Sequence, residues 1–163
     1  MNRIIRLDRR HLEQAATIDN ESAHQNSSKN VTKQEMRKQV RIRYEKGHEI
    51  FFGYREGKEL VGYVTLKPFF PGYKHCELYW LAVKKKAQGR GIGTRLMEFI
   101  EKYAKEKGFR KICLYTGENM KRTRRFYEKR GYKRINKFPE YYGYPTGTTT
   151  AVLYAKTLEG NEK

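Results

Sequence analysis

The 163-residue sequence predicts a mixed α/β protein, and three observations indicate this class. Apolar and aromatic residues gather in short runs typical of strands, two of which flank a glycine-containing turn and predict a hairpin. The segment 92–107 places apolar residues at i, i+3, i+4 and i+7, which predicts an amphipathic helix. Strands and helices do not alternate strictly, which argues against a doubly wound parallel sheet.

The first half of the chain is predicted to begin with a strand at 3–7 and a helix near 9–19. The polar stretch 20–30 is typical of a loop. Thr32, with Glu35 three residues later, predicts a capping box at the start of a very basic helix. We expect that helix at 33–46, hairpin strands at 49–54 and 60–66, and their turn at 55–59.

In the second half, a strand at 76–83 precedes a glycine-rich run and the helix 92–107, which Gly108 should end as a left-handed cap. Asn119 is the expected N-cap of a later helix that Gly131 stops. The remaining elements are a strand at 111–115, that helix to about 130, strands near 132–137 and 149–156, and an aromatic turn at 138–145.

Composition predicts one folded, soluble domain over 3–157, with a frayed tail at 158–163. The 36 Lys and Arg residues against 18 Asp and Glu give a formal net charge of +18, which attracts anions such as nucleic acid. Cys76 and Cys113 lie in apolar runs and are expected as buried free thiols. The four histidines are scattered, so the sequence does not predict a metal site. The sequence shows neither a signal peptide nor an apolar run of membrane length, which makes a cytoplasmic protein the default expectation.

The most informative stretch is the glycine run that opens the helix at 92. Glycines at Gly89, Gly91 and Gly93 permit tight turns, and a helix N-terminus directs N–H groups at an anion, so the run predicts a phosphate or pyrophosphate site. A P-loop is excluded because no Gly-Lys-Ser or Gly-Lys-Thr is present, and a dinucleotide fingerprint fails at Thr94. Around the loop, Lys84, Lys85, Lys86 and Arg90 could meet the remaining phosphate charge.

The run 88–93 (Gln-Gly-Arg-Gly-Ile-Gly) resembles the acyl-CoA signature Q/R-x-x-G-x-G/A of the GNAT superfamily of N-acetyltransferases. The apolar strand ending at 81–83 and the pattern Phe-Tyr-Glu-Lys-Arg-Gly-Tyr at 126–132 fit the same family. The order of elements agrees from residue 3 to 156, which is nearly the whole chain. The resemblance implies a mixed, mostly antiparallel central sheet with a splayed strand pair and about four flanking helices.

The resemblance also implies acetyl-CoA as co-substrate and no metal. Backbone groups of the strand before the loop would hold the pantetheine arm and the thioester oxygen, and the loop would hold the pyrophosphate. The implied cofactor-binding residues are Leu81, Ala82, Val83, Gln88, Gly89, Arg90, Gly91, Ile92, Gly93, Thr94 and Asn119. Asn119 stands one residue from the family's asparagine position, which Met120 occupies.

Two catalytic residues follow from the same resemblance. Tyr127 stands where the family places a tyrosine acid, although a packed core tyrosine is the alternative. Glu77 lies five residues before Ala82, where histone-type lysine acetyltransferases place a glutamate base, and an ion-paired strand residue is the alternative. The N-terminal acetyltransferases place their glutamate on the next strand, where this chain has Tyr115.

The acceptor follows least directly from the sequence. Glu140, Tyr141 and Tyr142 resemble the tyrosine pair with which N-terminal acetyltransferases hold a peptide, and packing is the equal alternative. The positive charge of 33–46 favours an α-amine or lysine in an acidic or ribosomal setting. The interpretation is acetyl transfer to a protein or peptide amine by direct attack in a ternary complex, by a monomer or homodimer. The alternatives are a small-molecule acceptor, or a non-catalytic CoA- or nucleic-acid-binding module.

Overall fold

The computed structural model describes residues 2–23, 31–144 and 147–158. They form two compact units. Unit 1 comprises Met1–Pro68 and Leu78–Tyr103, and unit 2 comprises Phe69–Glu77 and Ala104–Lys163. Hydrogen bonding orders seven strands as β1-β2-β3-β4-β5-β7-β6, and β4 (His75–Val83) belongs to both units. The predicted mixed, mostly antiparallel sheet with four α-helices is confirmed.

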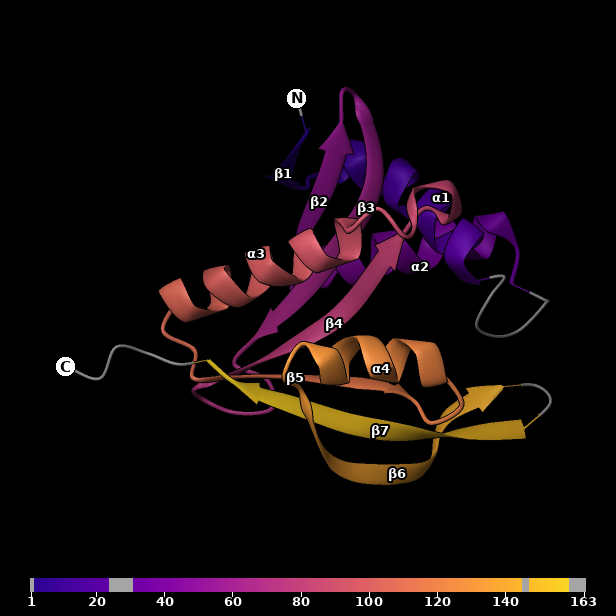
Figure 1. The fold of residues 1–163 in the computed structure, drawn as a ribbon. Helices are drawn as coiled ribbons and strands as arrows, with labels where there is room; N and C mark the ends of the chain where they lie inside the picture. Colours follow the sequence, from indigo (N-terminus) through magenta and orange to yellow (C-terminus); the bar gives the residue numbers. More distant parts are fainter. Residues whose placement is uncertain (1, 24–30, 145–146, 159–163) are drawn as a thin grey trace. The chain divides into compact units, whose positions relative to one another are not determined.

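Unit 1 has helices on both faces of its strands (Figure 1). Phe51 and Phe52, adjacent on β2, point to opposite faces because side chains alternate along a strand. Phe51 stacks on Tyr63 in the core beneath α1 and α2, whereas Phe52 packs edge-on against Phe99 and Tyr103 of α3. The elements are β1 (Asn2–Arg6), α1 (Leu12–Ala23), α2 (Lys33–Glu45), β2 (Ile50–Glu56), β3 (Glu59–Pro68) and α3 (Ile92–Glu106), with 3₁₀ turns at Arg9–His11 and Lys85–Ala87.

The helix α3 lies directly on β3 because Gly62 has no side chain. A Cβ at Gly62 would stand 3.2 Å from the Ile92 and Leu96 side chains and 3.2 Å from the Ala82 carbonyl oxygen. The predicted left-handed cap at the other end of α3 is confirmed, since Gly108 has φ 84° and Phe109 N–H bonds back to the Ala104 carbonyl. This packing places the start of α3 beside Gly62 of β3 and the Ala82 carbonyl of β4.

Unit 2 consists of β5 (Lys111–Gly117), α4 (Lys121–Lys129), β6 (Lys133–Tyr144) and β7 (Gly147–Thr157), with the first residues of β4. β7 pairs antiparallel with β5 from Lys111–Thr157 to Gly117–Ala151. α4 connects to β7 through the hydrogen bond from the Tyr154 hydroxyl to Glu128. The predicted free thiols are confirmed, because Cys76 and Cys113 are both buried and unbridged.

Two boundary predictions differ from the structure. α1 continues to Ala23, because its buried face includes Ile18 and Asp19 and tertiary packing overrides the weak helix propensity of Asn20 and Ser22. The rest of the predicted loop, 24–30, lies outside the described residues. The N-cap of α4 is Met120 rather than Asn119, and it makes no side-chain capping bond.

The predicted aromatic turn at 138–145 is wrong, because β6 runs on to Tyr144. Its pairing with β7 shifts register between Phe138 and Tyr142, and Glu140 has a positive φ of 54°. A β-bulge of this kind carries turn-like residues inside a strand. Leu158, the first residue of the predicted frayed tail, is buried and donates its N–H to the Arg110 carbonyl, and 159–163 lie outside the described residues.

Candidate functional site

The glycine loop has the backbone conformation that its sequence predicts. Gly89 and Gly91 have φ 76° and 77°, a region that other L-residues rarely enter. A Cβ at either position would meet nothing within 4 Å, so the requirement is conformational rather than steric. The N–H of Arg95 bonds to the Gly91 carbonyl, so the amides of Ile92 and Gly93 precede the first turn's bonds and lie at the positive end of the α3 dipole.

Side chains and backbone fix the loop to the strands beside it. The Gln88 side chain donates to the Val83 carbonyl at 3.1 Å, and the N–H of Lys84 donates to the Val61 carbonyl at 2.8 Å. Ala87 between them is buried. The amides that follow Gln88 are therefore held in place before a ligand arrives.

The basic side chains around the loop pair with nearby carboxylates. Lys84 Nζ lies 2.6 Å from Glu59, and Arg90 Nη2 lies 2.6 Å from Glu56. Lys86 approaches Glu59 at 3.6 Å, whereas Lys85 is exposed. The hydrogen bond from Lys84 lowers the pKa of Glu59. Of the four cations expected to meet phosphate, three are thus engaged within the protein.

The strand before the loop contacts Arg43 of α2 through two neighbouring aromatic residues. Tyr79 and Trp80 are neighbours, and the Arg43 guanidinium lies 5.2 Å from the first ring and 4.8 Å from the second. The parallel pairing of β4 with β5 covers three residue pairs, ending at Glu77–Cys113. Towards the end of β4, Ala82 is buried, and Leu81 and Val83 are half-buried.

A buried polar network supports this strand, and the sequence did not reveal it. Asp19, 2% exposed, accepts hydrogen bonds from the Tyr63 hydroxyl at 2.6 Å and the Trp80 indole N–H at 2.7 Å. Arg43 lies 4.0 Å from Asp19 and 2.5 Å from Glu49. Burial raises the pKa of Asp19 to about 6 against these stabilising contacts. The four elements involved are far apart in sequence, so no spacing could have signalled the network.

Glu77, the candidate base, is buried in unit 2 at 4% exposure. It lies opposite Cys113 in the β4–β5 register. Burial, with the Glu77 charge contributing, raises the pKa of Cys113 to about 12. Burial also raises the pKa of Tyr115, with contributions from the charges of Cys113 and Glu77. The Glu77 carboxylate therefore lies close to Tyr115.

Tyr115 also contacts Tyr141, one of the residues predicted to bind the acceptor. Its ring stacks on Tyr141 at 5.2 Å and 9°, and Phe138 lies 5.9 Å from Tyr115. Tyr142 meets Tyr141 edge-on at 4.9 Å. We use the name aromatic–carboxylate cluster for five residues of unit 2: Glu77, Tyr115, Phe138, Tyr141 and Tyr142. Tyr141 remains 49% exposed, which suits it to contact a ligand. Glu140 is exposed at the bulge.

Tyr127 lies on α4, 6% exposed, with its ring against Phe126 and Tyr132. Burial raises the pKa of Tyr127 well above its usual range, so the phenol keeps its proton. Asn119 is exposed and its side-chain oxygen lies beside Gly117, where a Cβ would approach it to 2.7 Å. The Asn119 side chain thus packs within the tight β5–α4 turn and does not cap α4 as predicted.

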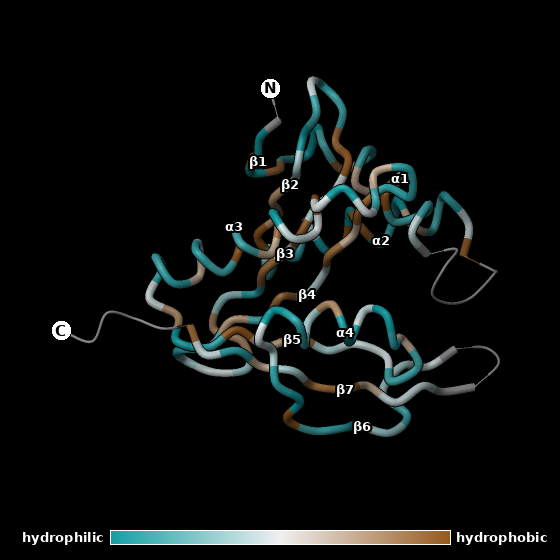
Figure 2. Tube along the Cα trace, in the orientation of Figure 1, coloured by the Kyte–Doolittle hydropathy of each residue, from teal (hydrophilic) through white to brown (hydrophobic). Residues whose placement is uncertain are grey.

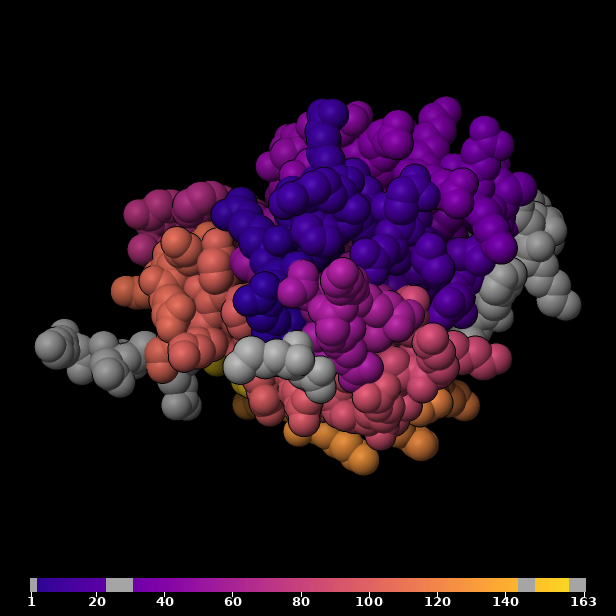
Figure 3. Space-filling view, turned by 90° about the horizontal axis from the view of Figure 1, so that it is seen from above, coloured from indigo at the N-terminus to yellow at the C-terminus, as the bar shows by residue number. Residues whose placement is uncertain are grey.

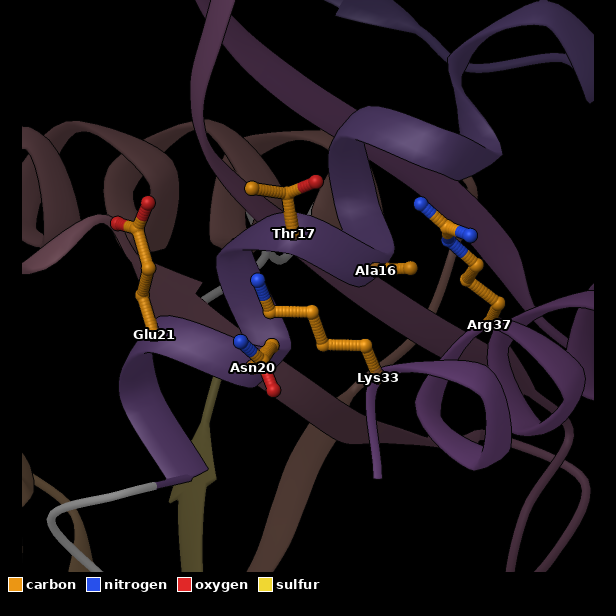
Figure 4. Close-up of a pocket in the computed structure, with 6 residues that line it drawn as sticks. All are labelled: Ala16, Thr17, Asn20, Glu21, Lys33 and Arg37. Atoms are coloured by element: carbon orange, nitrogen blue, oxygen red, sulfur yellow. The ribbon is translucent and has the colours of Figure 1, made fainter. Parts of the chain in front are cut away.

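A pocket of about 220 Å³ opens between α1 and α2 in unit 1 (Figure 4). Figure 3 shows these two helices in indigo and violet, side by side on one face of unit 1. The pocket is lined by Ala16, Thr17, Asn20, Glu21, Lys33 and Arg37, none of which the sequence singled out. Within the described ranges, no three His, Cys, Asp or Glu side chains could jointly hold a metal ion. None of the described helices has both the length and the hydrophobicity to cross a membrane.

Comparison with known proteins identifies the family. A model of the acetyltransferase (GNAT) family matches residues 12–132. The chain is 33% identical over 97 residues to "Probable N-acetyltransferase 14" of Xenopus tropicalis, covering 59% of this chain and 47% of that protein. It is 27% identical over 105 residues to "Uncharacterized N-acetyltransferase YhfO" of Bacillus subtilis (strain 168), covering 63% and 70%. The chain thus spans about half the length of the first of these relatives.

Solved structures agree in fold. A putative GNAT acetyltransferase from Desulfovibrio desulfuricans superposes with a TM-score of 0.81 at 19% identity, covering 98% of this chain and 100% of that one. The ribosomal-protein-S18-alanine N-acetyltransferase from Escherichia coli gives 0.79 at 16% identity, covering 100% and 99%. With the family model matching most of its length, the chain belongs to the acetyltransferase (GNAT) family.

Proposed function

We propose that this protein is an acetyl-CoA-dependent N-acetyltransferase that acts on a protein or peptide amine by direct attack in a ternary complex. The observation that carries the proposal is the pair of left-handed glycines, Gly89 and Gly91, between β4 and the N-terminus of α3. Family membership supports the same activity. We further propose a single acetyltransferase domain over 3–157 in the cytoplasm.

Unit 1 holds the co-substrate in this proposal. The amides after Gln88 bind the pyrophosphate, since a helix N-terminus with open glycine turns favours phosphate oxygens. Leu81 and Val83, at the end of β4, offer backbone groups to the pantetheine arm and to the thioester oxygen. A backbone N–H directed at that oxygen lowers the activation free energy by roughly 3 kcal/mol. Acetyl-CoA, when bound, supplies the activated acetyl group.

Glu77 accepts the proton of the acceptor amine, through a water molecule. Deprotonating a lysine amine at neutral pH costs about 4–5 kcal/mol, whereas an α-amine costs only about 1 kcal/mol. A single buried carboxylate suits the smaller task better. Glu77 and the cluster around it therefore favour an α-amine over a lysine.

Tyr127 stabilises the departing sulfur. A phenol is a weaker acid than a thiol, and burial raises the pKa of Tyr127 further. Complete proton transfer from Tyr127 to a thiolate is therefore uphill, so its role is to donate a hydrogen bond as negative charge develops. This differs from the simple acid expected from the family pattern.

Tyr141 and Tyr142 contact the first residues of the peptide, and Glu140 lies at the edge of the same surface. The half-exposed ring of Tyr141, fixed by stacking on Tyr115, offers a rigid aromatic wall. The Escherichia coli ribosomal-protein acetyltransferase, a neighbour in fold, is consistent with such an acceptor.

A panel of acceptors tests the proposal. Isotopically labelled acetyl-CoA is incubated with the protein and with free-amine peptides, the same peptides blocked at the α-amine, lysine-containing peptides and small amines. Mass spectrometry should locate label on free α-amines and none on blocked peptides. Labelling confined to small amines would replace the peptide acceptor, and no labelling together with no acetyl-CoA thermal shift would refute the enzyme.

A further inference from the structure

One face of α4 is cationic. Lys121, Arg122, Arg125 and Lys129 are exposed, and their spacing of one, three, four and seven residues puts them on one side of the helix. Buried Tyr127 lies on the opposite side. We call these four residues the α4 basic face. Figure 2 shows the hydrophilic residues that dominate this helix.

The α4 basic face opposes the stability of its own helix. Lys121–Arg125 and Arg125–Lys129 are like-charge pairs at i, i+4, which repel. Lys121 and Arg122 occupy the first turn, where the helix dipole disfavours cations, and Met120 provides no side-chain cap. The single acid of α4, Glu128, accepts the Tyr154 hydroxyl hydrogen bond at 2.6 Å. A bound polyanion would relieve all three conflicts.

Several basic residues elsewhere in the protein pair with acids. Arg37 of α2 pairs with Glu13 at 3.0 Å, Arg43 pairs with Glu49, and Arg90 pairs with Glu56. Among the ion pairs between described residues, none includes a member of the α4 basic face. Four exposed cations that no described ion pair includes therefore share one side of a single nine-residue helix.

We propose that the α4 basic face binds the phosphodiester backbone of a nucleic acid, independently of acetyl transfer. The nine helical residues from Lys121 to Lys129 span about 12 Å, the rise of several nucleotides at about 3.4 Å each. The arginines add planar guanidinium groups suited to phosphate oxygens.

A lipid surface fits α4 less well. A membrane-surface helix needs an exposed apolar face, but Tyr127 is buried and Phe126 is half-buried beneath the Arg130 guanidinium at 5.6 Å.

Phosphate contacts carry no base information, so binding of nucleic acid should be independent of its base sequence. Lys133 and Arg134, exposed at the start of β6, extend the positive charge beyond the helix.

Fluorescence anisotropy tests the inference with labelled RNA and DNA of about 20 nucleotides, single-stranded and duplex, in about 50 to 200 mM salt. Replacing all four residues by glutamine (K121Q, R122Q, R125Q, K129Q) should weaken binding at least tenfold. It should also reduce the salt slope on single strands by roughly 3, since each lost phosphate contact removes about 0.7.

The matched control removes four exposed cations elsewhere: K38Q, R41Q, K58Q and K105Q. Both variants lose the same charge, so an equal loss of affinity would overturn the inference in favour of non-specific attraction. Equal binding of polyglutamate or of anionic lipid vesicles by the wild type would also overturn it, as would displacement of RNA by coenzyme A.

The variant's folding provides a second readout. Since the side chains of the α4 basic face repel one another, the Tm of the quadruple glutamine variant should equal or exceed that of the wild type. If four substitutions prevent folding, K121Q with R125Q should still weaken binding severalfold. These measurements need no acceptor or turnover, so their failure would leave the proposed acetyl transfer intact.

Discussion

The glycine loop at 88–94 and the aromatic–carboxylate cluster are built from different parts of the chain. The loop relies on backbone amides of consecutive residues, set by Gly89 and Gly91 and by the N-terminus of α3. The cluster relies on side chains from β4, β5 and β6, and its central contact is Tyr115 on Tyr141. In the proposed function, co-substrate binding is therefore a local property, whereas acceptor recognition depends on tertiary structure. Substitutions in the two regions should consequently alter different kinetic parameters.

The largest effect is expected at Tyr127, in unit 2. Tyr127→Phe removes the hydrogen bond to the departing sulfur and should lower kcat by about 10³-fold, or ~4 kcal/mol, with the Kd of acetyl-CoA unchanged. Stopped-flow thiol release and calorimetric titration measure the two quantities. Tyr132→Phe is the matched control, since its ring packs against Tyr127. Equal losses in both variants would indicate packing rather than chemistry.

The Asp19 network should affect stability rather than turnover. The pKa of Asp19 is about 6 in the folded protein, against an ordinary value of 3.8 for an aspartate in the unfolded chain. The folded state therefore holds the proton more tightly. This contribution to stability is complete below about pH 4 and is lost as pH rises through 6, a change of roughly 3 kcal/mol. Urea unfolding of wild type and Asp19→Asn across this range should give a difference that varies with pH. A constant difference would contradict the raised pKa.

Glu77→Gln tests the carboxylate of the cluster. We expect kcat to fall by about 10²-fold and the acidic limb of the pH–rate profile to disappear, because the amine loses its proton acceptor. Glu118→Gln is the control, since Glu118 lies in the same unit but pairs with Lys137. A profile identical to that of wild type would assign proton removal to solvent.

Gly91→Val tests the loop. A β-branched residue at φ 77° costs about 1–3 kcal/mol and should shift the amides, raising the Kd of acetyl-CoA about tenfold with little change in kcat at saturation. Gly108→Val imposes the same kind of strain at φ 84° where α3 ends, and should leave the Kd unchanged. Comparable weakening in both would mean that strain acts through general destabilisation.

The smallest effect is expected at Tyr141. Tyr141→Ala removes the exposed wall of the cluster and should raise the KM for peptides about threefold, with the KM for acetyl-CoA constant. Tyr73→Ala, another exposed tyrosine in unit 2, is the control. A rise in the KM of acetyl-CoA instead would assign Tyr141 to the co-substrate.

The sequence predicted those features that depend on neighbouring residues. Thr32 and Glu35 form the expected capping box, Gly108 and Gly131 are left-handed, and α3 begins at Ile92. The features it missed depend on distant residues. The bulge at Glu140 was interpreted as a turn, because its register with β7 is a tertiary property. The pairing of Lys84 with Glu59 and the Asp19 network arise for the same reason.

Hydrogen exchange followed by mass spectrometry, with and without acetyl-CoA, tests the central claim most directly. If the loop binds the pyrophosphate, acetyl-CoA should slow exchange most strongly in peptides that cover 88–94 and in the strand residues just before them. Peptides covering 138–143 should change only when an acceptor peptide is added. Protection that spares 88–94, or that appears at the cluster with acetyl-CoA alone, would contradict the division between a local co-substrate site and a tertiary acceptor site.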